Sequence, residues 1–584
     1  MILQALVRCY DALAANGKVQ KPGWSPVKVT WGMELDADGN LIRLLPLAST
    51  NEKGKAIPQT MFVPDPVKRS SGIAANFLCD NAAYMLGLDS KGRPERTKGC
   101  FAACGEIHRK TLANVHHPMA LAILRFFEKW NPDQAEACPS LQPYLEELKK
   151  GGNLVFYLNG TEVQSVPEIQ RAWDEAYASD ESAVKGRCLV TGDETSIAIL
   201  HPSFKGIYGA QPTGASLVSF NARAFESHGH EEAQGLNAPV GTRAAFAYGS
   251  ALNYMLREPE YHKRLDDTTV VFWAEGGEAA YSDFFSDLWD SNGNEITQDD
   301  LSGIMDNLSH GQSVCWENVP LNPDNRFYIL GLSPNSARLS VRFFLQDTFG
   351  GFVQNLQQHY EDISIIRPSY DEWETLPIWA LLKETANPNS RDKKAPDRLV
   401  GELMRAVLTG SLYPLSLFMQ AETRIRAEKE VSRGKAAIIK GYLTRYLRSH
   451  PDSMSFPKEV LNVKLNDSTT YPPYLLGRLF AVLESMQSAA NPGINATIKD
   501  RYFNSACASP ATVFPTLLRL AQSHQRKLDG GLHIHYDKML TSLMGSLGES
   551  FPDRLSLQDQ GIFQLGYYHQ KQQLFTKKED QENV

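Results

Sequence analysis

The residues best suited to chemistry lie in a glycine-rich run, HPSFKGIYGAQPTGASLVSFN, at positions 201–221. Glycine lets a backbone approach a partner closely and adopt positive φ. The side chains of Gln, Thr and Asn can hydrogen-bond to phosphates or base edges without a fixed charge. The run therefore predicts a loop that holds a polymer, and its candidate contact residues are Lys205, Gln211, Thr213 and Asn221.

The glycine spacing fits no nucleotide-binding signature, because G-K-[ST] and G-x-G-x-x-G are both absent. A tight connection between two strands explains the spacing equally well. The chemistry favours the binding hypothesis: a side-chain amide on a projecting turn, such as Gln211, is suited to reading base edges or wedging a duplex.

A second candidate is the segment KRSSGIAANFLCDN at positions 68–81, where a basic pair, two hydroxyls and a glycine precede a predicted helix. Cations, hydroxyls and free backbone N–H groups at a helix start suit contact with phosphates or bases. The alternative is an ordinary helix start, with Ser71 as N-cap and the basic pair in solvent. The candidates are Lys68, Arg69, Ser70, Ser71, Asn76 and Asn81.

Two groups of residues could be taken for metal ligands. His228 and His230 flank a glycine near two glutamates, but such residues in a polar loop are usually surface residues. Cys100, Cys104 and His108 share one helical face, where free cysteines usually just pack. We therefore expect no metal and no cofactor, and the sequence lacks the serine-hydrolase, zinc-protease and deaminase signatures.

Two basic regions could contact phosphates. Strand alternation would place Arg338, Ser340 and Arg342 on one sheet face. The stretch 398–448 carries ten Lys and Arg against four carboxylates. Its candidates for holding a single strand are Arg424, Arg426, Lys435 and Lys440.

The elements that would position these candidate residues predict an α+β fold. Periodicity predicts helices at 2–15, 99–115, 119–130, 169–179, 242–256 and 349–361. It predicts β-hairpins at 28–47 and 326–345, and strands at 153–159, 187–191, 197–200, 215–220 and 268–274. We expect a mixed α/β region at 1–385, a polar linker at 386–396 and an all-α bundle at 397–584. Its helices are predicted at 399–408, 414–429, 434–447, 473–488, 510–527 and 529–548.

Composition narrows the class of protein. A chain of 584 residues is too long for one core. Its net charge of −8 argues against a free-standing nucleic-acid binder, though not against a subunit that contacts nucleic acid locally. Eight scattered cysteines fit a reducing cytoplasm. We expect neither a signal peptide nor a membrane span, because no long apolar stretch occurs.

Several long stretches together resemble one family. They include PGWSPVKVTW, RSSGIAANFLCDNAAYMLG, KGIYGAQPTGASLVSFNARAFESHG, FYILGLSPNSARLSVRFF and YPPYLLGRLFAVLESMQSAANPGINATIKDRYFNSACASPATVFPTLL. The chain is similar over nearly its full length to the large subunit of the type I-C CRISPR surveillance complex, Cascade.

The resemblance implies a cytoplasmic, non-catalytic subunit of a ribonucleoprotein for antiviral defence. The expected partners are crRNA, target double-stranded DNA, the backbone, handle-binding and small Cascade subunits, and a helicase-nuclease recruited after R-loop formation. The subunit would recognise the protospacer-adjacent motif (PAM) and help open the duplex. Protein then reads only a short motif, because base pairing reads the rest.

The family role also distributes the candidate residues. The 68–81 group would line the duplex entrance, the loop group would read the PAM or wedge the strands apart, and the basic helices would hold the displaced strand. The C-terminal region resembles the small subunit, and Met454 is a candidate internal start for it. The competing hypotheses are a metal-dependent nuclease using His228 and His230, and a purely structural scaffold.

Overall fold

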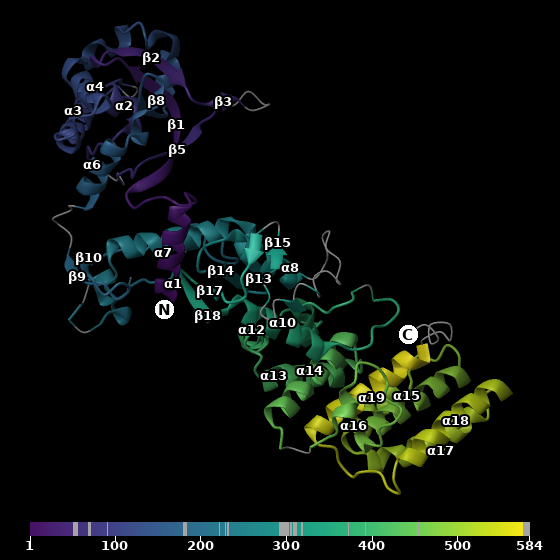
Figure 1. Cartoon of the computed structure of the whole chain (residues 1–584). Helices are drawn as coiled ribbons and strands as arrows, with labels where there is room; N and C mark the ends of the chain where they lie inside the picture. Colours follow the sequence, from purple (N-terminus) through teal and green to yellow (C-terminus); the bar gives the residue numbers. More distant parts are fainter. Residues whose placement is uncertain are drawn as a thin grey trace. The chain divides into compact units, whose positions relative to one another are not determined.

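The computed structural model describes residues 1–50, 56–67, 72–89, 92–178, 184–220, 222–227, 229–230, 233–290, 303, 306–307, 312, 314–316, 319–371, 373–391, 393–396, 398–452 and 455–575. The chain forms two compact units (Figure 1). The first contains Leu3–His201 and Phe220–Ala251, and the second contains Pro202–Ser219 and Leu252–Val584.

A mixed sheet organises the first unit. Its strands run in the order β2-β1-β7-β6, with β5 paired to β1 and β8 paired to β7. The pair β1 and β7 is parallel and the other pairs are antiparallel. The strands are β1 (Trp24–Leu35), β2 (Leu41–Pro46), β5 (Gln59–Pro64), β6 (Cys79–Asn81), β7 (Asn153–Leu158) and β8 (Thr161–Glu162). Two small pairs are β3 (Ser49–Thr50) with β4 (Ala56–Ile57), and β9 (Lys185–Arg187) with β10 (Glu194–Ser196).

The apolar partners of this sheet come from α2 (Ala82–Met85), α3 (Pro94–Leu112), α4 (Pro118–Lys129), α5 (Leu145–Lys150) and α6 (Pro167–Ala178). A further helix of the unit is α1 (Ile2–Ala15). Phe126 and Phe127 of α4 pack edge-on against Phe156 of β7, each with ring centroids 5.9 Å apart. Aromatic burial of this kind dominates core energetics.

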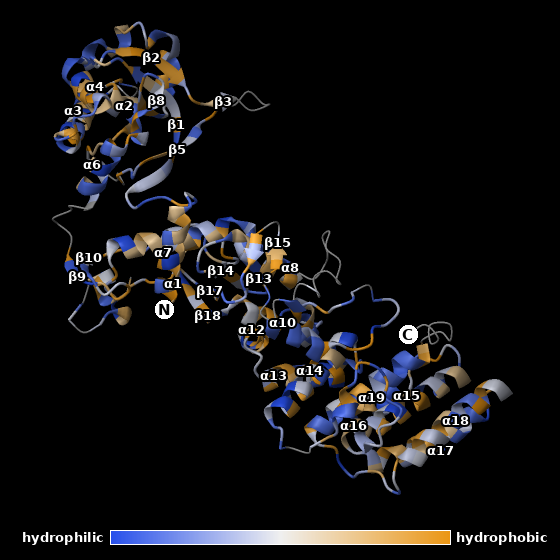
Figure 2. Cartoon of the chain, in the orientation of Figure 1, coloured by the Kyte–Doolittle hydropathy of each residue, from blue (hydrophilic) through white to orange (hydrophobic). Residues whose placement is uncertain are grey.

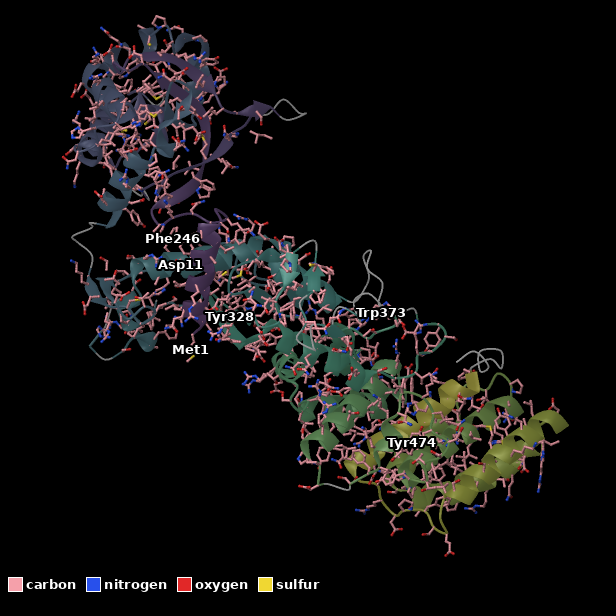
Figure 3. All side chains as sticks on the ribbon, viewed as in Figure 1. Met1, Asp11, Phe246, Tyr328, Trp373 and Tyr474 are labelled. Carbon is pink, nitrogen blue, oxygen red and sulfur yellow. The ribbon has the colours of Figure 1, made fainter. Side chains whose placement is uncertain are left out.

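Helix α1 packs on α7 (Thr242–Arg257), whose first ten residues belong to the same unit. Tyr10 meets Phe246 edge-on at 5.9 Å, and Asp11 accepts a hydrogen bond from Arg243 at 2.8 Å. Figure 3 labels Asp11 on α1 and Phe246 on α7. The apolar face predicted for residues 2–15 is therefore a packing face.

A second sheet opens the second unit, with strand order β11-β12-β18-β17-β14-β13. The strands are β11 (Ser203–Phe204), β12 (Ala215–Ser216), β13 (His262–Leu265), β14 (Thr268–Ala274), β17 (Arg326–Asn335) and β18 (Arg338–Thr348). A small separate pair is β15 (Val314–Trp316) with β16 (Val319–Leu321). All seven residues of β14 are buried, and its Trp273 stacks on Tyr328 of β17 at 5.3 Å.

Helices dominate the rest of this unit, and most of them carry both apolar and polar residues (Figure 2). They are α8 (Ala279–Asp290), α10 (Phe349–Ile363), α11 (Ile378–Thr385), α12 (Leu399–Thr409), α13 (Leu415–Glu428), α14 (Arg433–Ser449), α15 (Pro472–Ala490), α16 (Ile498–Ala508), α17 (Pro510–Gln525), α18 (Gly530–Ser546) and α19 (Leu557–Phe575).

Two glycines bring α15 and α19 into close contact. A Cβ added at Gly477 would lie 1.8 Å from the carbonyl oxygen of Phe563. One added at Gly566 would lie 2.1 Å from the carbonyl oxygen of Tyr474. Each helix therefore has a glycine where the backbone of the other passes, and no other residue fits there.

The predicted α+β class is confirmed, and most predicted helices match within a few residues. Three predicted strands are wrong in place or length: short strands occupy 185–187 and 194–196, and only Ala215–Ser216 of 215–220 is strand. The periodicity does not predict helices α5, α8, α11, α16 and α19. In the described part of the chain, no helix is long and apolar enough to span a membrane.

The domain limits at 385 and 397 stay a prediction. The segment 386–396 lies inside the second unit, where helices before and after it share one apolar core. Asp362 of α10 precedes the segment and accepts hydrogen bonds from Arg445 and Arg448 of α14, which follows it.

Candidate nucleic-acid interface

The predicted glycine loop connects β11 to β12 at the end of the second sheet. Gly206, Gly209 and Gly214 adopt φ values of +88°, +77° and +97°, which side-chain-bearing residues rarely adopt. A Cβ at Gly214 would lie 3.1 Å from the Phe204 carbonyl oxygen. We call residues 205–214, whose path the glycines permit, the reading loop, after the role that the sequence predicts for it.

A stacked arginine braces the reading loop. The guanidinium carbon of Arg264, on β13, lies 3.1 Å from the ring centroid of Tyr208. The Tyr208 backbone N–H also donates to Thr269 Oγ1 at 3.3 Å, and Arg264 Nε donates to the carbonyl of Asp266 at 3.0 Å. These contacts fix the middle of the loop to the start of β14 and the end of β13.

The polar tip of the reading loop faces solvent. Lys205, Gln211 and Thr213 are all exposed, and the Gly214 N–H closes the turn on the Gln211 carbonyl at 2.9 Å. Three of the four residues predicted here are therefore exposed on one braced loop. The fourth, Asn221, lies outside the described residues.

The arginine stripe on β18 is interrupted. Ser216 of β12 pairs with Arg338, so β18 begins beside the end of the reading loop. A β-bulge then leaves Arg342 between Val341 and Phe343, which pair with Leu332 and Gly331. The alternation argument for one common face therefore fails at Arg342, which instead bonds Asp267 at 3.1 Å.

In the second candidate segment, Lys68, Arg69, Ser70 and Ser71 lie outside the described residues. Asn76 is buried, and its Oδ1 accepts from the Val67 N–H at 2.9 Å. Asn81 is the N-cap of α2 and accepts from the Ala83 N–H at 3.0 Å. Both asparagines have a structural hydrogen bond, so a role at the duplex entrance would rest on their remaining donors.

Two of the four candidate cations on the basic helices are buried. The Lys435 ammonium forms an ion pair with Glu428, and its side chain is 4% exposed. The Lys440 ammonium donates to the carbonyls of Asp362 and Glu361 at 3.0 and 3.3 Å. Burial lowers the Lys440 pKa to about 8. Both lysines hold helices together, so a strand outside cannot reach them without rearrangement.

The other two candidates lie on α13. Arg424 is 15% exposed and lies 3.7 Å from Glu428. Arg426 is 47% exposed and donates to Gln560 Oε1 at 2.7 Å. Of these four cations, Arg426 is the most accessible to a phosphate.

The metal site predicted as an alternative at Cys100, Cys104 and His108 gains no geometric support from the described residues. His108 Nε2 accepts from the Leu78 N–H at 3.0 Å, and its Nδ1 lies 2.7 Å from the Cys104 carbonyl. Both ring nitrogens are thus engaged, and burial lowers the His108 pKa to about 4. His228 and Glu231 lie outside the described residues, as does Met454. Among the residues that are described, no three His, Cys, Asp or Glu side chains are grouped to hold a metal ion.

The comparison with protein families shows to which family the chain belongs. The family described as CRISPR-associated protein (Cas_Csd1) matches residues 6–575. The chain belongs to this family. Csd1 proteins are the large subunits of type I-C Cascade, so the chain is a CRISPR-associated Cascade subunit that partners with other Cascade components and crRNA. None of the curated proteins matches the chain.

Sequence reasoning missed the brace of the reading loop. Tyr208 stood inside the predicted loop, but its stacking partner Arg264 lies far along the chain, in a strand that the pattern did not predict. No local motif could have paired them, because the contact depends on how the sheet folds.

Proposed function

We propose that this Csd1 subunit recognises the PAM in target double-stranded DNA with the reading loop and helps to open the duplex for R-loop formation. It performs no covalent chemistry and offers a docking surface to the helicase-nuclease. The observation that supports PAM reading is the braced loop, which presents an exposed amide, hydroxyl and ammonium beyond a close-fitting glycine backbone.

Each tip residue has a distinct part in this proposal. The Gln211 amide can donate to and accept from base edges, which carry the sequence information. The Thr213 hydroxyl and the Lys205 ammonium suit phosphates, which position the duplex without specifying its sequence. Prior bracing lowers the entropy lost when the loop engages DNA.

In this proposal the helices of the second unit bind the displaced DNA strand. The exposed guanidinium of Arg426 is the best placed of the predicted cations, and Arg424 lies two residues away on the same helix. Contacts of this kind are electrostatic and tolerate any sequence.

The test uses the assembled complex with crRNA and duplexes that differ only in the flanking motif. Gln211→Ala should reduce the ratio of affinities between correct and incorrect flanks about tenfold, since a good base contact contributes roughly 1–3 kcal/mol of discrimination. Gln134→Ala, at an exposed glutamine of the first unit, is the matched control. Unchanged discrimination in Gln211→Ala, or unchanged affinity of Lys205→Ala for PAM-bearing duplex, would refute the assignment of that residue. DNA cleavage by the purified chain with Mg²⁺ or Mn²⁺ would refute the non-catalytic role.

A further inference from the structure

The first unit contains a cavity of about 720 Å³, and Asn81, one of the residues predicted to line the duplex entrance, is part of its lining. Its walls come from α2, the first turn of α3 and the end of α5. Among the described lining residues, Arg93, Arg96, Lys149 and Lys150 are cationic, and Asp89 is the one carboxylate. We name these four cations, with the space between them, the basic cavity.

The cations of the basic cavity are accessible. Arg93, Arg96 and Lys150 are exposed, and Lys149 is 30% exposed with its ammonium 2.9 Å from Glu136. Arg96 Nη2 donates to the Gly72 carbonyl at 2.6 Å, which fixes the guanidinium at the cavity wall. The lining of this cavity therefore carries an excess of positive charge, although the whole chain has a net charge of −8.

The start of α3 adds neutral donors to the same wall. Arg93 is the N-cap and Pro94 is the first helical residue, and no side chain among the described residues caps this end. The first-turn N–H groups of a helix carry partial positive charge and suit anions. Arg93, Arg96 and Thr97 at this helix start line the cavity, and the first turn also carries one exposed carboxylate, Glu95.

We propose that the basic cavity binds phosphate groups of a nucleic-acid backbone. The proposal rests on the function proposed above, because it takes the backbone to be that of the crRNA or of the target DNA. A guanidinium can grip a phosphate with two parallel hydrogen bonds, and an ammonium can bind it as a point charge. The cavity then positions the strand but reads no sequence.

The experiment compares two double variants of the full chain. One removes cations of the basic cavity, and the other removes cations of α3 outside it. Arg93→Ala/Lys150→Ala removes two cations of the cavity. Arg109→Ala/Lys110→Ala removes two exposed cations at the far end of α3, roughly 20 Å from the first turn at about 1.5 Å per residue. Circular dichroism and melting temperature confirm that each variant is folded.

Binding is measured by fluorescence anisotropy across a salt series. The probes are a single-stranded RNA, a single-stranded DNA and a duplex of one sequence, and inorganic phosphate serves as competitor. We expect the cavity variant to bind about five- to twentyfold more weakly. Its slope of log affinity against log salt should fall by about two, one unit for each phosphate that a removed cation no longer neutralises. The control variant should change less than twofold, and the probe that is weakened identifies the source of the phosphates.

Two results would overturn the proposal. One is equal behaviour of the cavity and control variants with every probe. The other is a cavity that responds to inorganic phosphate alone, which would remove the nucleic acid from the proposal. Failure of the proposed function looks different: the assembled complex would then bind correct and incorrect flanks alike, whatever the state of the cavity.

Discussion

The Nε of Arg445 lies 2.8 Å from Oδ2 of Asp362, and both side chains are 1% exposed. The same guanidinium donates to the carbonyls of Ala406 and Ser411 at 2.6 and 2.7 Å and stacks 4.0 Å from the Tyr413 ring. One buried ion pair thus joins α10 and α14 to the end of α12 and the loop that follows it. The basic composition of 398–448 serves this internal network as well as the surface.

Arg445→Ala should destabilise the second unit by about 3–5 kcal/mol, because it leaves the Asp362 charge with fewer partners in the interior. Urea unfolding monitored by circular dichroism measures the change. Arg405→Ala, at an exposed arginine of α12, is the matched control and should change stability by less than about 0.5 kcal/mol. Similar midpoints for the two variants would contradict the structural role assigned to the pair.

Gly477→Ala should destabilise the packing of α15 on α19 by about 1–3 kcal/mol or more, because the new methyl group would overlap the Phe563 carbonyl. Gly545→Ala on α18 provides the contrast. A Cβ there meets nothing within 4 Å, so the higher helix propensity of alanine should leave stability unchanged or raise it slightly. Thermal melting of both variants checks the prediction, and an unchanged Gly477→Ala midpoint would exclude the close crossing.

Glu422 should make stability depend on pH. Burial raises the pKa of its carboxyl to about 7, although Gln564, which donates at 3.0 Å, and Arg426, 3.5 Å away, oppose the shift. The folded state therefore holds a proton that the unfolded state releases at its ordinary pKa near 4.5. The stabilisation is complete below that value and is lost as the pH rises to about 7.

The measurement is the free energy of unfolding of wild type and Glu422→Gln from pH 4.5 to 8. Stability of the wild type relative to the variant should fall by on the order of 3 kcal/mol across that range. Glu459→Gln, at an exposed carboxyl, should show no such trend relative to wild type. A flat difference for Glu422→Gln would mean that the carboxylate is solvated or fully paired.

The stacking of Arg264 on Tyr208 can be tested with variants that remove either the Tyr208 ring or only its hydroxyl. Tyr208→Leu should weaken binding of PAM-bearing duplex by the assembled complex a few-fold, since an exposed cation–π contact contributes roughly 0.5–1 kcal/mol. Tyr208→Phe keeps the ring and the backbone bond to Thr269, so it should bind like wild type. Arg264→Gln should resemble Tyr208→Leu. Equal losses in the leucine and phenylalanine variants would point to the hydroxyl and away from the stack.

The sequence predicted those elements whose periodicity is local. The face of α1, the β17–β18 hairpin and the Ala-rich α7 each follow from spacing within a few turns. Helix α19 does not follow from spacing. Its residues 561–570 are buried on every face, including His569 and Gln570, so no apolar stripe marks the helix.

The candidate site divides in the same way. Glycine chemistry correctly predicted the positive φ values of this loop, since they are a property of single residues, and the loop's contact with DNA stays a prediction. The sequence does not distinguish Lys435 and Lys440 from Arg426, yet both lysines are buried. The carbonyls that bind Lys440 belong to α10, whose approach depends on tertiary packing.

In the reading loop, one set of residues fixes the backbone path and another set presents hydrogen-bonding groups to solvent. Glycines, the Tyr208 ring and the Arg264 guanidinium set the backbone path, whereas Gln211 and Thr213 project from it. Exchanging the two tip residues should therefore alter the displayed donors and acceptors while the scaffold stays in place. On the function proposed here, changing Gln211 should change which flanking motif the subunit prefers, whereas changing Thr213 should alter only how firmly the duplex is held.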